Sequence, residues 1–210
     1  MDAVSEDVSN LRTAGGSPGK YAKGRAQREE IIETAYEVFT ERGMTQTSFR
    51  AVGEEVGLSH AGLKHYFPTP TALMLEVLER RDQRAISDPN PIPLPQRIMA
   101  AAVDNVSMPG ILALHSTLLG SAVDPGSTAA RSFFVDRYER SRAYLVEELK
   151  RSTSLDPAEC AQLAALVLAA FDGIQMQWLL DPERVDMAAS LSWIARLIES
   201  AGSEGSAEGA

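Results

Sequence analysis

The stretch from Thr47 to Phe67 constrains the fold of this chain more than any other. Val52 and Val56 lie four residues apart, which places them on one face of a short helix. Gly57 favours the left-handed backbone conformation that ends a helix at low cost. Ser59 follows with a side chain suited to cap a second helix. The stretch therefore predicts two short helices joined by a sharp turn.

The second of these helices has an apolar side and a polar side. Leu63 and Phe67, again four residues apart, are expected to anchor it to a core. The remaining positions are small, polar or rich in hydrogen-bond donors: His60, Ala61, Gly62, Lys64, His65 and Tyr66. Such a helix suits insertion into the major groove of DNA. An ordinary helical hairpin is the alternative, because helix-turn-helix spacing alone is a loose signal.

Apolar residues recur at helical spacing along most of the chain, and no segment alternates polar and apolar residues over the length of a strand. We therefore predict an all-α protein. The expected helices cover residues 26–42, 48–56, 59–66, 69–85, 95–107, 110–122, 128–151, 157–180 and 186–200. Four prolines between Ser87 and Pro95 make the clearest break. Residues 1–24 and 201–210 are expected to be disordered tails.

The charge of the chain is unevenly distributed. The net charge is −9, but residues 20–84 carry ten Lys or Arg and ten Asp or Glu, so the excess lies outside this segment. A neutral N-terminal module is compatible with DNA binding through a local basic patch. Lys20, Lys23, Arg25 and Arg28 cluster at the end of the expected tail and the start of the first long helix, either as a solvated basic arm or as a contact to DNA.

The sequence gives no sign of a metal site, a cofactor or a membrane span. The single cysteine, Cys160, excludes an internal disulfide and suits a reducing compartment. No apolar run is expected to cross a membrane and the N-terminus lacks a signal-peptide core, so we expect a cytoplasmic protein. A small all-helical enzyme is disfavoured, because no histidine pairs with Cys160 at a recognisable spacing and no HExxH motif or phosphate loop is present.

Residues 28–78 resemble the N-terminal domain of the TetR (tetracycline-repressor) family. The positions in register are Arg28, Ile31, Ile32, Ala35, Phe39, Gly43, Thr47, Ser48, Val52, Gly57, Leu58, Ser59, Leu63 and Phe67. The resemblance implies a three-helix, helix-turn-helix DNA-binding domain over residues 25–70. It also implies a helical effector-binding and dimerisation domain over residues 71–200, entered through a fourth helix.

The resemblance also assigns DNA-contacting positions by register. These are Arg28, Thr47, Ser48, Ser59, His60, Ala61, Gly62, Lys64, His65 and Tyr66. Thr47 and Ser48 match positions that approach phosphates at a helix N-terminus. Residues 60–62 match positions that meet base edges, and residues 64–66 match positions near the backbone or the groove wall.

Three residues depart from the family pattern. Gly53 replaces the usual Ala, at a cost of about 1 kcal/mol in a helix. Lys64 stands where Tyr is usual, and Pro70 replaces a Lys at the start of the fourth helix. These departures leave open a dimeric helical adaptor that no longer binds DNA.

The helix over residues 157–180 is apolar nearly all round, which is typical of a helix buried on more than one side. With the helix over 186–200 it is expected to form a four-helix bundle between two copies, the alternative being packing within one monomer. Two recognition helices spaced by roughly 34–36 Å would then read a palindromic operator.

Polar or aromatic residues on the apolar C-terminal helices are candidates for contact with an effector, although each also suits a core. They are His115, Phe133, Tyr138, Phe171, Gln175 and Trp178. Their surroundings favour a small, largely apolar or amphipathic molecule. Together with these residues, the resemblance implies a ligand-responsive transcriptional regulator, acting as a homodimeric repressor that its effector releases from DNA.

Overall fold

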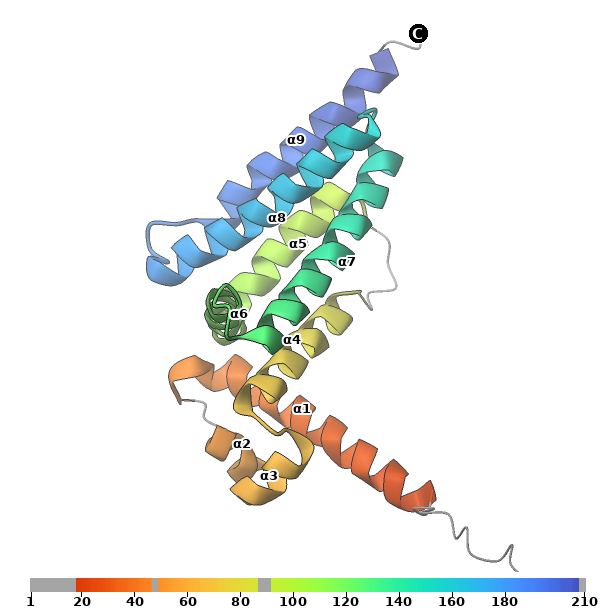
Figure 1. The fold of residues 1–210 in the computed structure, drawn as a ribbon. Coiled ribbons are helices and arrows are strands. Elements are labelled where there is room, and N and C mark those ends of the chain that lie inside the picture. The colour runs from red at the N-terminus through yellow and green to blue at the C-terminus, as the bar shows by residue number, and fades with distance from the viewer. Residues whose placement is uncertain (1–17, 47–48, 87–91, 208–210) are drawn as a thin grey trace, which may run out of the picture.

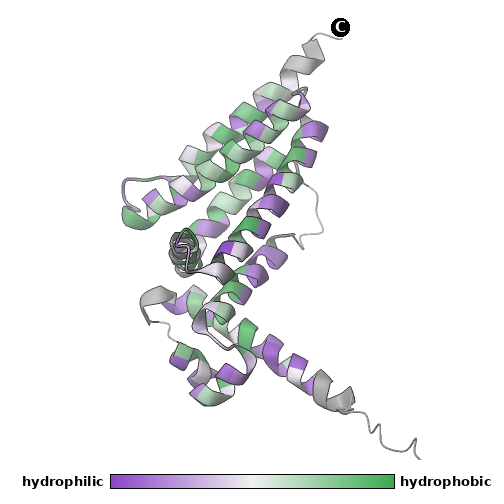
Figure 2. Cartoon of the chain, viewed as in Figure 1, coloured by the Kyte–Doolittle hydropathy of each residue, from purple (hydrophilic) through white to green (hydrophobic). Residues whose placement is uncertain are grey.

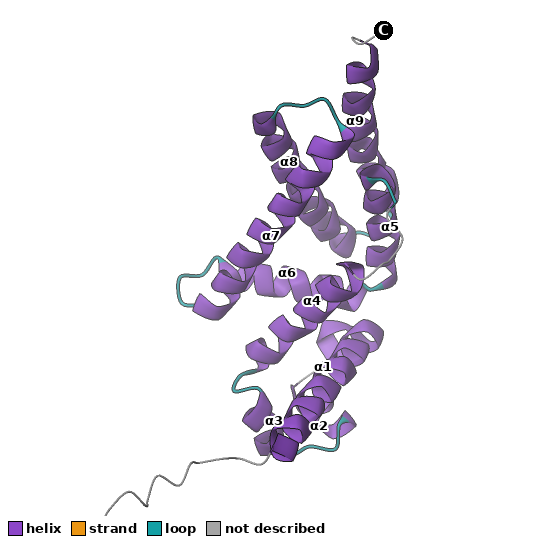
Figure 3. Cartoon of the chain, turned by 90° about the vertical axis from the view of Figure 1, so that its right-hand side faces the viewer, coloured by secondary structure: helices purple, strands orange, loops and turns teal. Residues whose placement is uncertain are grey.

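The computed structural model describes residues 18–46, 49–86 and 92–207. Every regular element within these ranges is a helix, which confirms the predicted all-α class (Figure 3). The elements are α1 (Pro18–Gln46), α2 (Phe49–Glu55), α3 (His60–Tyr66), α4 (Pro70–Ile86), α5 (Leu94–Ser107), α6 (Pro109–Ala122), α7 (Thr128–Ser152), α8 (Pro157–Leu180) and α9 (Met187–Ala207). Figure 1 shows α1–α3 at one end of the molecule, α4 next to them, and α5–α9 beyond.

Local capping explains where α3 and α8 begin. The Ser59 hydroxyl accepts a hydrogen bond from the Gly62 amide at 3.1 Å, and Gly57 before it has φ +69°. Asp156 and Glu159 form a reciprocal capping box at the start of α8. These contacts join residues three apart, and the Ser59 cap is one predicted from the sequence.

Both terminal helices are longer than the sequence indicates. Residues 18–24 and 201–207 were assigned to disordered tails, and that assignment is wrong, because α1 begins at Pro18 and α9 continues to Ala207. At the C-terminal end, tertiary contact supports the extension, since the Ser154 amide donates to the carbonyl oxygen of Ala201 at 3.3 Å. Residues 1–17 and 208–210 lie outside the described residues.

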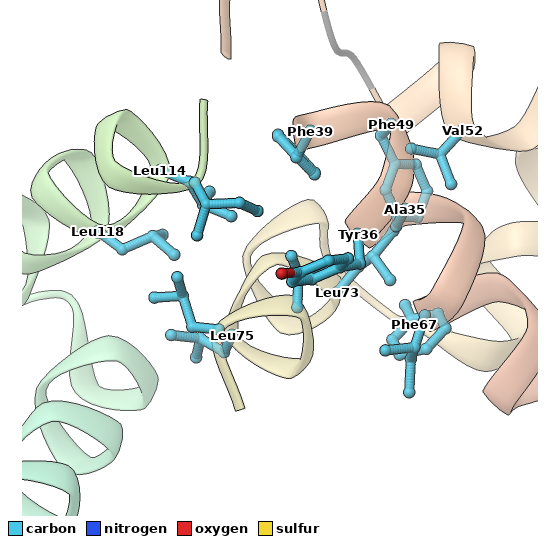
Figure 4. Packing of buried hydrophobic residues seen from close by; sticks show 14 of the residues in the cluster. Ala35, Tyr36, Phe39, Phe49, Val52, Phe67, Leu73, Leu75, Leu114 and Leu118 are labelled. Carbon is cyan, nitrogen blue, oxygen red and sulfur yellow. The ribbon is translucent and has the colours of Figure 1, made fainter. Parts of the chain in front are cut away.

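One apolar core joins the N-terminal helices to the C-terminal helices. It contains Phe39 of α1, Phe67 after α3 and Leu73 of α4, and it continues into α6 through Leu114 and Leu118. Figure 4 shows these α6 side chains facing those of α1 and α4. Because these side chains are closely packed, a movement of α6 would displace α1 and α4, the helices that pack next to the helix-turn-helix.

Backbone lies directly on backbone where α6 meets α1. Gly43 interrupts α1 with φ +68°, and Gly110 at the start of α6 packs against it. A Cβ atom on Gly110 would lie 2.0 Å from the carbonyl oxygen of Phe39 and 2.7 Å from the Cα of Gly43. No side chain larger than hydrogen fits at Gly110 unless the two helices separate.

A second apolar core holds α5, α7, α8 and α9 together, with Leu149, Val167 and Leu191 almost fully buried. Figure 2 shows apolar residues along much of α8 and α9. Contrary to the sequence expectation, α8 is long and apolar enough, by length and composition, to cross a membrane. The bent pair α5–α6 passes the same test only if taken as one broken span across its 98° angle. Core helices of soluble proteins also pass it, so the signal is weak.

Candidate DNA-binding and effector sites

The outer face of α3 presents a group of polar and small side chains. His60, Ala61, Lys64 and His65 are all exposed, and their spacing places them on one side of the helix. Tyr66 is half-buried against the first apolar core and contacts the ring of His65 edge to face, at 5.3 Å between centroids. The exposed side therefore offers two imidazoles and one ammonium group as hydrogen-bond partners.

Buried contacts hold α3 in place behind this face. Leu63 is 0 % exposed and Phe67 is 1 % exposed. The turn before α3 is tight, because a Cβ atom on Gly53 would lie 2.9 Å from the carbonyl oxygen of Leu58. From the sequence alone, Gly53 is expected only to weaken α2. The structure shows why glycine suits this position, because a Cβ atom would come too close to the Leu58 carbonyl oxygen. The ring of His60 also packs edge to face on Phe49, at 5.6 Å between centroids.

The other predicted DNA contacts are placed differently. The Arg28 guanidinium pairs with the carboxylate of Glu76 on α4 and lies 5.0 Å from the centroid of the Phe67 ring. Its role within the fold is thus to join α1 to α4 and the end of α3. The Ser59 hydroxyl is occupied by the Gly62 amide, and Gly62 itself is half-buried. Thr47 and Ser48 lie outside the described residues.

A group of ionisable side chains, with His115 buried and the others partly buried, joins α4 to α6, α7 and α8. We call it the polar cluster: Asp82, His115, Arg137, Tyr138 and Asp172. Arg137 donates two hydrogen bonds to the Asp82 carboxylate, at 2.6 and 3.0 Å, and its Nη1 lies 3.2 Å from His115 Nε2. The Tyr138 hydroxyl donates to Asp172, and His115 Nε2 lies 4.0 Å from the same carboxylate.

Burial sets the charge states in the polar cluster. It lowers the pKa of His115 to about 3, helped by the positive charge of Arg137, so the imidazole is neutral at pH 7. Since Arg137 can only donate, the Nε2 atom of His115 accepts its hydrogen bond. Burial alone would lower the pKa of Arg137, but the hydrogen bonds and charge of Asp82 outweigh it and the pKa is raised. Burial also raises the pKa of Asp172, against the hydrogen bond from Tyr138.

The six effector candidates fall into two groups in space. His115 and Tyr138 belong to the polar cluster, and Phe133 lies beside them through the ring of Phe134, 5.4 Å away between centroids. Phe171 and Trp178 pack against the second apolar core, and Gln175 of α8 is buried with 7 % exposure.

Sequence reasoning missed three members of the polar cluster, namely Asp82, Arg137 and Asp172. The hydrogen bond between Arg137 and Asp82 joins residues 55 positions apart. No local motif links such residues, so only the assembled fold brings them together. Among the described residues, no group of His, Cys, Asp and Glu side chains is arranged to hold a metal ion.

Two family models match the parts of the chain that carry these sites. Residues 31–77 match the model described as bacterial regulatory proteins of the tetR family, which covers the second half of α1, α2, α3 and the first half of α4. Residues 118–202 match the C-terminal model of BetI-type transcriptional repressors. This chain belongs to the TetR family.

Individual relatives agree with this assignment. The TetR-family protein is 27 % identical over 173 residues to the HTH-type transcriptional regulator PksA of Bacillus subtilis, covering 76 % of this chain and 82 % of PksA. A regulator from Saccharomonospora viridis, solved in complex with choline, shares the fold at a TM-score of 0.62 with 19 % identity, over 83 % of this chain and 96 % of that one. A TetR-family regulator from Streptomyces coelicolor gives 0.64 with 17 % identity, over 88 % and 83 %.

The protein is therefore a DNA-binding transcriptional regulator of the TetR family with a ligand-binding C-terminal domain. The matched families are regulators, not enzymes.

Proposed function

We propose that this TetR-family protein is a homodimeric repressor that binds a palindromic operator and is released from it by a small, largely apolar effector. The observation that carries the DNA-binding part is the exposed face of α3. Lys64 would contact a phosphate, and His60 and His65 have the donors and acceptors that base edges require. The net charge of −9 makes this local face, and not the whole surface, the site of contact.

An uncovered apolar seam on α8 supports the dimer. Leu166, Met176 and Leu180 are 50 %, 42 % and 80 % exposed, and together with Ala169 and Gly173 they recur at spacings of three and four residues. A seam of this kind is typical of helices that pack against a partner helix. Nothing lies within 4 Å of a Cβ atom built on Gly173, so the monomer does not require glycine there. The close approach of a second α8 would require glycine at this position.

A similar face on α9 extends the seam. Trp193 and Leu197 are 69 % and 46 % exposed and lie four residues apart. Two copies of α8 and α9 would bury these side chains in a four-helix bundle about a two-fold axis. Such a dimer presents two copies of α3, and the distance between them decides whether both fit successive major grooves roughly 34–36 Å apart.

The polar cluster supports a response to an effector. It ties α4 to three helices of the C-terminal half through the Asp82–Arg137 pair. A ligand that binds one arrangement of α6, α7 and α8 more tightly than another would shift the position of α4, and with it the spacing of the two recognition helices. The choline complex of the S. viridis relative supports ligand binding within this fold.

Substitution of Lys64 tests the DNA contact. Lys64→Ala should weaken binding to all duplexes by about tenfold at 0.1 M salt and lower the slope of log affinity against log salt by about 1, since one phosphate contact is lost. The control is Lys150→Ala, which removes the same charge from an exposed site on α7. Binding is measured by mobility shift on duplexes selected from a random pool. If the wild-type protein shifts no duplex at low salt, the adaptor alternative holds and the repressor proposal fails.

Substitution of Gly173 tests the dimer. Gly173→Lys adds a charge at the centre of the seam while leaving the monomer unstrained, because the position is exposed and open. The dimer dissociation constant should rise by about 100-fold or more. Gly120→Lys, at an equally open position on α6, is the matched control. Analytical ultracentrifugation at micromolar concentration distinguishes the two; equal dimerisation of both variants would refute the seam.

A further inference from the structure

A surface groove of about 470 Å³ lies between α5 and the connection from α8 to α9. Val103 and Val106 of α5 and Trp178 of α8 form part of its apolar wall, and Glu183 and Asp186 lie at its edge. The volume falls within the range of small-molecule sites, roughly 300–1,000 Å³. Of the six effector candidates, Trp178 is the one found among the residues that line it.

The apolar wall is unusually open for its composition. Val103 is 61 % exposed and Val106 is 41 % exposed, although both belong to a helix whose other side lies in the second apolar core. The indole of Trp178 is half-buried beside them. Adjacent apolar side chains exposed in this way are found at protein-, membrane- and ligand-binding surfaces, and here they line a groove that can take a ligand.

The charges at the edge select among ligands. Arg184 is 3.7 Å from the carboxylate of Asp181, so its charge is balanced by a residue outside the groove lining. Asp186 accepts a hydrogen bond from the Ala189 amide at 2.8 Å, which fixes its carboxylate at the start of α9. Glu183 is exposed and has no ion-pair partner within residues 18–46, 49–86 and 92–207. The edge is therefore net negative.

An indole face, aliphatic side chains and a carboxylate without an ion-pair partner are together the chemistry that recognises an organic cation. The protein already uses such a contact on α9, where the Arg196 guanidinium lies 4.0 Å from the Trp193 ring centroid. No lysine or arginine within the described ranges lies over the Trp178 ring in this way. The indole is thus available to a cation from solution.

We propose that this groove binds a small organic cation with an apolar body, its cationic head held between the Trp178 indole and the Glu183 carboxylate. The apolar body covers Val103 and Val106. Gln175 and Asp172 precede Trp178 by three and six residues on α8, so the groove lies about 9 Å along the helix from the polar cluster. A cation bound in the groove as the proposed effector would act on α4 through this part of α8. This regulatory step rests on the proposed function, whereas the binding of the cation does not.

Fluorescence of a single tryptophan tests the binding without DNA. Trp193→Phe leaves Trp178 as the sole indole, since the chain has two tryptophans. We expect a saturable change in its emission with hexyltrimethylammonium, and at least fivefold weaker binding of hexanol and of hexanoate, which share the alkyl chain but not the charge. Glu183→Gln should weaken the cation by about fivefold, and Glu139→Gln, at an exposed carboxylate on α7, should not.

Three results would each overturn the proposal. They are equal affinity for hexyltrimethylammonium, hexanol and hexanoate, the absence of a saturable signal, and an unchanged affinity for the cation in Glu183→Gln. Trp178→Leu, measured by calorimetry, should abolish preference for the cation while keeping an apolar wall. If the cation binds as expected but leaves operator affinity unchanged, the groove stands and the effector part of the proposed function fails instead.

Discussion

The contact between Gly110 and α1 gives a sharp prediction about how the two halves of the protein are joined. A Cβ atom at this position would lie 2.0 Å from the Phe39 carbonyl oxygen. Carbon and oxygen atoms in contact usually lie roughly 3.3–3.6 Å apart, so Gly110→Ala must push α6 away from α1 by roughly 1 Å or more. Both partners are backbone atoms of helices, and neither can rotate aside as a side chain could.

The cost follows from this geometry. Overpacking by one methyl group usually destabilises a protein by about 1–3 kcal/mol. We expect the upper part of that range, about 2–3 kcal/mol, because the clash is with backbone and disturbs the core shared by α1, α4 and α6. The better helix propensity of Ala offsets at most about 1 kcal/mol, and less in the first turn of a helix.

Urea denaturation of Gly110→Ala and Gly120→Ala at one protein concentration measures the difference. Gly120 lies on the same helix with nothing within 4 Å of its built Cβ atom, so Gly120→Ala should stabilise the protein by up to about 1 kcal/mol. The reasoning is refuted if the two variants have the same free energy of unfolding. Operator affinity should also fall in Gly110→Ala alone, because only this variant moves α6 relative to the DNA-binding helices.

Two further predictions concern the polar cluster. Asp82→Asn removes the carboxylate that compensates the buried guanidinium of Arg137, and should cost about 3 kcal/mol in urea denaturation; Glu79→Gln, which breaks a more exposed pair with Arg140, should cost less than about 1 kcal/mol. His115 makes the free energy of unfolding fall as the pH is lowered. Its pKa is about 3 in the folded state and 6.5 in the unfolded state, so below pH 6.5 the unfolded state binds a proton that the folded state does not. Above pH 6.5 it has no effect, and by pH 5 it should have lowered the free energy of unfolding by about 2 kcal/mol. His115→Gln should flatten the stability profile between pH 7.5 and 5, and an unchanged profile would exclude His115 as its cause.

The sequence alone determined those features that depend on neighbouring residues. The starting points of α3 and α8 follow from Ser59 and Asp156, whose side chains accept hydrogen bonds from amides two or three residues away. The all-α class and the family also follow, because apolar spacing and turn residues are local patterns. His60, Ala61, Lys64 and His65 are exposed on one side of α3, because helical spacing fixes which positions share a face. Gly62 and Tyr66 are half-buried, and contact of α3 with DNA stays a prediction.

The tertiary structure decided the features that depend on contacts between residues far apart in the sequence. It placed the Arg28 guanidinium beside Glu76, and it packed Gly110 against the backbone of α1, which no sequence spacing predicts. It also assembled the polar cluster from four helices, pairing Arg137 with a carboxylate 55 residues away. The physical reason is range: a cap acts within one helical turn, whereas burial, close backbone contact and charge pairing depend on which helices pack together.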